Sequence, residues 1–274
     1  MKTRSIVIIV LSAILAISLI LLACVSLRPE VIGSSELETR EFDLKNFTTV
    51  EVGSALNVNF KDSDTFKVNI SPSDSYYVSI TANRNLFDYL VVTDDGGTLR
   101  INLKSFHRYN RVKLEAQITM PAISGLQLSS ASEGQLSGFK SLNELSLEVS
   151  EASNLTMTDM EAGDSRFAIS GASTVTGTVK AVTAEFNISG ASTIELTGSA
   201  HKIDAQGSGA SSVRLADFPT SNAKFNLSSA SNGTTNVSDT LDIILSEASR
   251  LVYTGNPNLG SVSISGASTL NHQQ

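Results

Sequence analysis

Apolar and polar residues alternate along most of the chain after residue 45, and the alternation is clearest in the second half. Phe167-Ala-Ile169 is followed after a short gap by Thr174-Val-Thr176, and Phe186-Asn-Ile188 is followed in the same way by Thr193-Ile-Glu-Leu196. A period of two is typical of β-strands with one buried face. No helical period appears in this half, so the pattern predicts an all-β fold.

A phrase of four small residues lies between these alternating runs and recurs eight times. Its most regular form is Ser-Gly-Ala-Ser, as at Ser170–Ser173, and its third residue is always alanine. Glycine and serine suit a sharp corner, because glycine tolerates unusual dihedrals and serine can bond the local backbone. We therefore interpret the eight alanines as structural corner residues; they are Ala131, Ala152, Ala172, Ala191, Ala210, Ala230, Ala248 and Ala267.

The steps between successive alanines are 21, 20, 19, 19, 20, 18 and 19 residues. A near-constant step of this size predicts a solenoid in which each repeat buries its apolar face against its neighbours. About 19 residues leave room for roughly three short strands and not for a crossover helix. The sequence therefore predicts a parallel β-helix with about 19–20 residues per turn.

Stacked turns would place equivalent residues above one another. Inside, we expect ladders such as Phe167, Phe186 and Phe225, or Ile169, Ile188, Leu227, Leu245 and Ile264. Outside, residues six positions before successive corner alanines would form one column of mixed charge, which consists of Arg166, Glu185, Asp204, Lys224 and Asp242. Opposite charges one turn apart would give modest support between strands.

Residues 41–120 alternate without the corner phrase and are expected to form irregular N-terminal turns or a cap, before the regular repeats of residues 121–274. The expected strands are Thr48–Val52, Leu56–Phe60, Phe66–Ile70, Tyr77–Ile80, Leu90–Thr93, Leu99–Leu103 and Val112–Ile118. Asp94–Gly97 predicts a tight turn and Asn83–Tyr89 a short helical turn. Val52-Gly-Ser-Ala-Leu56 resembles a degenerate first corner; Ala55 lies 76 residues before Ala131, which equals four steps of 19.

The first 23 residues are of a different kind. Lys2 and Arg4 precede an apolar run from Ile6 to Ala23, as in a secretory signal peptide, and Leu21-Leu22-Ala23-Cys24 is similar to a bacterial lipobox. Cys24 is the expected site of lipidation, with residues 24–40 as a tether. An uncleaved signal anchor and simple secretion are the alternatives. All three place the rest of the chain outside the cytoplasm, and we expect it at the cell membrane or the outer envelope surface, anchored at the N-terminus.

Charge and composition reduce the number of possible functions. The whole chain carries 20 basic and 27 acidic residues, and loss of residues 1–23 removes two basic ones, which gives 18 − 27 = −9. This balance argues against nucleic-acid binding and leaves the N-terminal lipid or signal anchor as the contact with the membrane. Cys24 is the single cysteine, so the exported part has no internal disulfide.

The sequence predicts no catalytic, cofactor-binding or metal site. His107, His201 and His272 do not recur with the serines, as a nucleophile and its base would require. Glu151 and Glu247 replace the corner glycine and are expected to face solvent. One basic cluster could contact an acidic glycan or phosphate, although a solvated loop is the simpler interpretation; it comprises Lys104, His107, Arg108, Arg111 and Lys113.

Together, the repeated Ile-Ser-Gly-Ala-Ser phrase, the anchor that ends at Cys24 and the lead-in Phe47-Thr-Thr-Val-Glu-Val resemble the bacterial head GIN family of auto-transporter adhesin head domains. The resemblance covers roughly residues 45–270. It implies a right-handed β-helix that is exported and often lipoprotein-anchored, and it implies no catalytic residues.

These observations favour a non-enzymatic cell-envelope protein: an adhesin or a surface or assembly scaffold that binds a protein or glycan on a cell. A polysaccharide lyase or hydrolase of the β-helix type is one alternative. A self-polymerising scaffold is another, because the chain stops six residues after Ser268 and the final turn could serve as a docking edge for a second copy.

Overall fold

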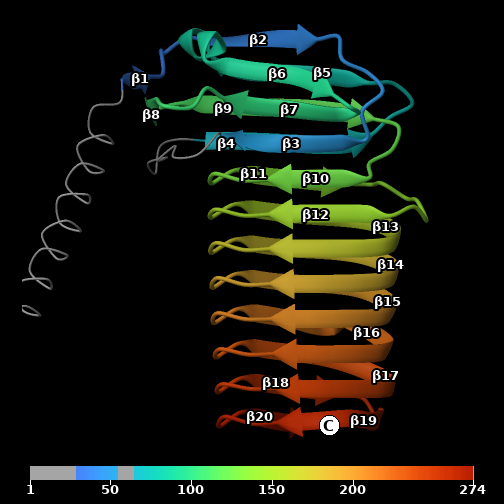
Figure 1. The fold of residues 1–274 in the computed structure, drawn as a ribbon. Coiled ribbons are helices and arrows are strands. Elements are labelled where there is room, and N and C mark those ends of the chain that lie inside the picture. The colour runs from blue at the N-terminus through green and yellow to red at the C-terminus, as the bar shows by residue number, and fades with distance from the viewer. Residues whose placement is uncertain (1–28, 55–64, 274) are drawn as a thin grey trace, which may run out of the picture.

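The computed structural model describes residues 29–54 and 65–273, and it is a parallel β-solenoid (Figure 1). The all-β prediction and the predicted parallel stacking are both confirmed. The predicted signal peptide, Cys24 and the expected strand Leu56–Phe60 lie outside the described residues. Among the residues that the structure describes, no helix is both long and apolar enough to cross a bilayer.

Each regular turn consists of one long bent strand and one tight corner, rather than the three short strands that we expected. The long strands are β13 (Asn154–Ile169), β14 (Thr174–Ile188), β15 (Thr193–Gly207), β16 (Ser212–Leu227) and β17 (Asn232–Leu245). Glycines with positive φ make several of the bends: Gly177 has φ 137° and Gly198 has φ 119°. Each strand therefore runs on through the bend and ends only at the corner, although its pairing shifts register at the bend between β13 and β14, between β15 and β16 and between β16 and β17.

The bend divides every turn into two segments, which form two facing sheets. The pre-turn sheet contains the segments that lead into the corners; it includes β10 (Gly125–Leu128), β12 (Leu145–Val149), the second halves of β13–β17 and β19 (Asn258–Ile264). The post-turn sheet contains the segments that follow the corners; it includes β11 (Glu133–Ser137), the first halves of β13–β17, β18 (Arg250–Thr254) and β20 (Thr269–His272).

The apolar side of both sheets fills the space between them. Phe167 lies opposite Phe186 with ring centroids 5.0 Å apart, and the same ladder continues through Ala205 to Phe225. Small Ala205 leaves room for Phe218, whose ring packs edge-on against Phe186. The predicted inner ladders are thus confirmed. Burial of each such side chain stabilises the fold by about 1.5–3 kcal/mol.

The N-terminal strands cap the stack. β3 (Thr49–Ser54), β7 (Thr98–Leu103) and β6 (Leu90–Asp95) extend the pre-turn sheet, whereas β4 (Thr65–Pro72), β9 (Lys113–Met120), β5 (Tyr77–Asn83) and β2 (Leu37–Phe42) extend the post-turn sheet. The 3₁₀ helix η1 (Arg84–Asp88) closes the core between them with Leu86 and Phe87. The described strands, the turn at Asp94–Gly97 and the short helix agree with the predictions.

The cap does not stack in the order of the sequence. The β3–β4 turn lies between the β7–β9 turn and the β10–β11 turn (Figure 1). Val52 is therefore one turn away from Leu128, and the Ser129 N–H donates to the Val52 carbonyl at 3.0 Å. The count of four steps between the degenerate corner and the first regular one was wrong, because residues 73–123 build the cap instead of intervening turns.

Strand pairing begins earlier than the tether predicted for residues 24–40 would allow. β1 (Glu30–Ile32) pairs with β8 (Arg108–Asn110), and β2 starts at Leu37 and pairs with β5. The folded part thus includes the second half of that segment.

Candidate functional site

The corners are tight turns in which the second and third residues both have positive φ. At Ser170–Ser173 these are Gly171 with φ 66° and Ala172 with φ 62°. The fourth residue closes the turn; the Ser153 N–H, for example, donates to the Ser150 carbonyl at 3.3 Å. This is the pattern of type I′ turns, and it explains why glycine recurs at the second position.

All eight corner alanines have φ between 57° and 62°. The alanine N–H continues the ladder between turns, as in the bond of 2.8 Å from Ala172 to the Gly190 carbonyl. Glu151 and Glu247 are exposed, and each accepts a hydrogen bond from a serine one turn away. The corner residues thus have a structural role: they form the tight turn and continue the hydrogen-bond ladder between neighbouring turns.

The two serines of each corner have different environments. The fourth serine is buried in every corner but the last, and Ser192 Oγ accepts the Ser173 N–H at 3.2 Å. The first serine, at Ser170, Ser189, Ser208 and Ser228, is half-buried, and its hydroxyl forms no hydrogen bond to another described residue. A row of hydroxyl groups at the turn spacing of about 4.8 Å is therefore available to a ligand.

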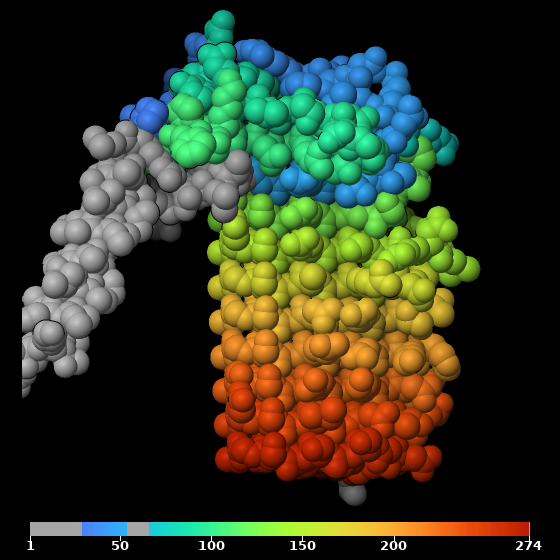
Figure 2. Space-filling view, viewed as in Figure 1, coloured from blue at the N-terminus to red at the C-terminus, as the bar shows by residue number. Residues whose placement is uncertain are grey.

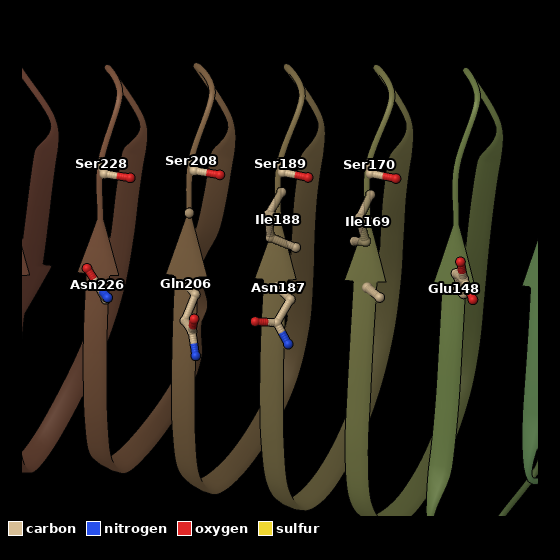
Figure 3. A pocket seen from close by; sticks show the side chains of 12 residues that line it. Glu148, Ile169, Ser170, Asn187, Ile188, Ser189, Gln206, Ser208, Asn226 and Ser228 are labelled. Carbon is tan, nitrogen blue, oxygen red and sulfur yellow. The ribbon is translucent and has the colours of Figure 1, made fainter. Parts of the chain in front are cut away.

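A column of amides lies next to this row of hydroxyls on the outer side of the pre-turn sheet (Figure 3). Asn187, Gln206 and Asn226 follow one another in strand register and are exposed. The Asn187 amide donates to Glu185 Oε1 at 3.0 Å, whereas the Gln206 and Asn226 amides bond no other described residue. Each free amide offers two donors and an acceptor.

These two rows border a shallow groove with a volume of about 340 Å³. Glu148 lies at one end, and Ala168, which carries no long side chain, widens the groove beside Asn187. We call this surface the amide groove and define it by Glu148, Ala168, Asn187, Gln206, Asn226 and the first serines of the four corners. Apart from the Glu148 carboxylate at one end, it offers neutral donors and acceptors at a repeating distance.

The predicted charge column borders the amide groove on the side away from the corners. Strand register places Arg166, Glu185, Asp204, Lys224 and Asp242 in one line, as predicted. Arg166 lies 3.5 Å from Glu185, and Lys224 lies 3.9 Å from Asp204. Because oppositely charged neighbours in the column pair with each other, the column stabilises neighbouring turns and adds little net charge to the groove.

Two members of the predicted basic cluster are tied to the loop that carries them. Lys104 Nζ donates to the Asp88 carbonyl at 2.7 Å, and His107 Nδ1 lies 3.0 Å from the Ser105 carbonyl, with its ring against Tyr89. Both side chains therefore contact the backbone and help to hold the loop between β7 and β9. Within the described ranges, no group of three or more His, Cys, Asp or Glu side chains could hold a metal ion.

A second shallow groove, with a volume of about 580 Å³, lies on the outer side of the post-turn sheet. Arg214, which borders it, is paired with Glu195 at 3.1 Å. The register shift between Leu215 and Thr220 in β16 also interrupts the ladder there. The amide groove is the more regular surface, and its chemistry could not be read from the corner phrase alone, because its amides belong to the strands.

Comparison with known proteins agrees with this architecture. The sequence model of a family described as "Putative auto-transporter adhesin, head GIN domain" matches residues 46–257. No curated protein matches the sequence.

Several solved structures share the fold, including three from Parabacteroides species. A putative adhesin from Parabacteroides merdae is 16% identical, with a TM-score of 0.77 over 90% of this chain and 100% of that one. From Parabacteroides distasonis, a putative lipid-binding protein is 19% identical with a TM-score of 0.75, and a putative adhesin is 14% identical with a TM-score of 0.76. Both alignments cover 89% of this chain and 100% of the other.

Proposed function

Since the chain belongs to the head GIN domain family, we propose that it is a non-enzymatic adhesion protein of the cell envelope. It would be held at the membrane through its N-terminus, with Cys24 as the lipidated residue, and would present the solenoid outward. The amide groove is the observation that supports this function: an uninterrupted polar array over several turns suits a long repeating ligand better than a single small molecule.

The chemistry of the amide groove favours a neutral, hydroxyl-rich ligand, such as a surface glycan. Amides and serine hydroxyls both donate and accept, as sugar hydroxyls do. The groove has no exposed aromatic platform, so many weak polar contacts along the ladder would have to provide the affinity. We therefore expect binding to increase with the length of the glycan, since linked contacts raise avidity.

Binding of the purified protein to a glycan array and to fixed cells tests this proposal. A triple variant, Asn187→Ala with Gln206→Ala and Asn226→Ala, should lose binding at least about tenfold while its melting temperature stays within a few degrees of the wild type. The matched control carries Thr156→Ala, Thr176→Ala and Thr234→Ala on the outer side of the post-turn sheet. Equal binding by wild type and the triple variant would contradict the proposal.

A polysaccharide lyase or hydrolase remains the second candidate. It requires acids and bases that converge on one bond of the substrate, whereas Glu185 and Asp204, beside the amide groove, are paired with Arg166 and Lys224, and Glu148 is the one acid among the residues that line it. Release of new reducing ends or unsaturated products from an acidic glycan by the purified protein would favour the enzyme over the adhesin.

A further inference from the structure

The last turn of the described stack is open. β19 bonds to β17 and β20 bonds to β18, and no described strand pairs with their other edges. The core is uncovered there as well: Leu259, Val262 and Ile264 are 46%, 44% and 44% exposed. Their equivalents one turn earlier are fully buried; these are Leu241, Ile243 and Leu245. The bottom of Figure 2 corresponds to this end.

The opposite end of the molecule is protected in two ways. The 3₁₀ helix η1 covers the core, with Leu86 fully buried and the Arg40 guanidinium 4.2 Å from the centre of the Phe87 ring. The edge strands also carry charges: β2 contains Glu38, Arg40 and Glu41, and β6 contains Asp94 and Asp95. Charged side chains on edge strands are a common protection against pairing with another chain.

The open end has no such protection. Residues 251–273 include no Asp, Glu, Lys or Arg, although the whole chain has a net charge of −7. The neutral stretch coincides with the two unpaired edges and the uncovered apolar side chains. A partner that fits must therefore offer two strand edges with an apolar surface between them, and its contact surface must carry no net charge.

We propose that a second copy of this chain supplies that partner, through its own open end. A two-fold axis perpendicular to the solenoid would bring the two end turns together. It would make the new strand pairs antiparallel, which is a favourable arrangement for exposed edges. Leu259, Val262 and Ile264 of both copies would then be covered, and the acidic bodies of the two molecules would lie far from the contact.

The assembly would be a closed dimer and not a filament. Growth beyond two copies would require the open end to pair with the cap, but the charges of β2 and β6 and the cover of η1 oppose that contact. The proposal does not depend on the ligand of the amide groove, because that surface lies on the flank of the stack.

The experiment measures the molar mass of the full chain in detergent, by sedimentation with the detergent contribution subtracted, over a range of concentrations. Val262→Lys places a charge in the contact and should raise the dimer dissociation constant at least about a hundredfold. The side chain of Val262 is accessible in the monomer, so this variant should keep its β-sheet circular dichroism and melting temperature. Ser263→Lys, on the outer side of the same strand, is the matched control and should remain dimeric.

Leu37→Lys tests the other end, because Leu37 is 52% exposed on the edge strand β2 of the cap. It should leave the dimer intact. The proposal is overturned if the wild type is monomeric at every concentration, if Val262→Lys leaves the dimer unchanged, or if Leu37→Lys dissociates it. A dimer that survives Val262→Lys would be assigned to contacts outside the open end, and filaments would point to head-to-tail contacts.

Discussion

At the scale of single residues, position within the corner decides what a serine does. Ser189 and Ser192 bracket the same turn, yet the Ser189 hydroxyl faces the amide groove and the Ser192 hydroxyl is buried in a ladder between turns. The difference follows from the alternation along each strand: Ser189 comes directly after the buried Ile188 and points outward, whereas Ser192 lies two residues before the buried Ile194 and points inward. Identical residues therefore have separate roles.

This difference gives a prediction for the buried serines. Ser192→Ala removes the acceptor of the buried Ser173 N–H and should lower the free energy of unfolding by about 1–3 kcal/mol. Ser189→Ala, the matched control, should change it by less than about 0.5 kcal/mol. Urea unfolding followed by circular dichroism measures both variants. If the two substitutions lowered the free energy of unfolding equally, the buried Ser192 hydroxyl would contribute no more to stability than the Ser189 hydroxyl.

At the scale of the strand, the bends limit which residues are allowed. A Cβ added to Gly198 would lie 1.9 Å from the Val179 carbonyl oxygen, and Gly198 also has φ 119°, which disfavours other residues. Two turns can stack at this bend only because no side chain stands between them. The bend at Gly198 thus restricts the residue type as strongly as the corner does, although the bends recur in the sequence much less regularly than the corners.

Gly198→Ala should therefore destabilise the protein by about 2 kcal/mol or more, since both the strain and the contact oppose it. Ser199→Ala, at the neighbouring position, serves as the control and should have a small effect. The midpoint of urea unfolding distinguishes the two. A wild-type midpoint for Gly198→Ala would mean that the backbone relaxes freely at the bend.

The cap strands contain a buried group that should respond to alkaline pH. Tyr109 in β8 is 2% exposed and donates to the Lys104 carbonyl at 2.7 Å. Burial, with a smaller effect of Tyr89, raises the pKa of Tyr109 above its ordinary value of 10.0. The folded state therefore holds this proton more tightly than the unfolded state, and its stabilising effect is present below pH 10 and lost as the pH rises further.

We expect the melting temperature of the wild type to fall more steeply above pH 10 than that of Tyr109→Phe. At neutral pH the variant should be less stable by about 1 kcal/mol, because the hydrogen bond to Lys104 is lost. Tyr77→Phe, at an exposed site, should follow the wild type across the whole range. Parallel pH profiles for wild type and Tyr109→Phe would refute this account of alkaline sensitivity.

At the scale of the whole molecule, each turn depends on the turns beside it. Middle strands such as β15 pair on both sides, whereas β19 and β20 pair on one side within the described stack. Stability in such a stack is close to a sum of repeat and neighbour contributions. The final turn has one neighbour and an uncovered core, so it should be the least stable regular turn.

Hydrogen exchange followed by mass spectrometry tests this expectation. In the Val262→Lys variant, peptides from β19 and β20 should exchange at least about tenfold faster than peptides from β15. The Ser263→Lys variant provides the comparison at the same strand. Uniform protection along the stack in Val262→Lys would contradict the view that neighbouring turns supply the stability.

The amino-acid sequence was enough to predict the repeat, the buried side of each strand and the order of the columns. The alternation decides which side chains face inward, and the alanine spacing decides which residues stack, so the columns through Phe167 and Arg166 follow directly. The sequence could not predict the amide groove, whose neutral side chains carry no signal apart from their place in the stack.

The order of the cap strands and the continuity of the long strands became defined only in the folded molecule. Backbone hydrogen bonds are the same for every sequence, so alternation cannot specify which strand edge the β3–β4 turn pairs with. Packing places it beneath the β7–β9 turn, although that turn comes later in the chain. A bend depends on local backbone clearance, as at Gly198, and this becomes defined only when the neighbouring turn is in place.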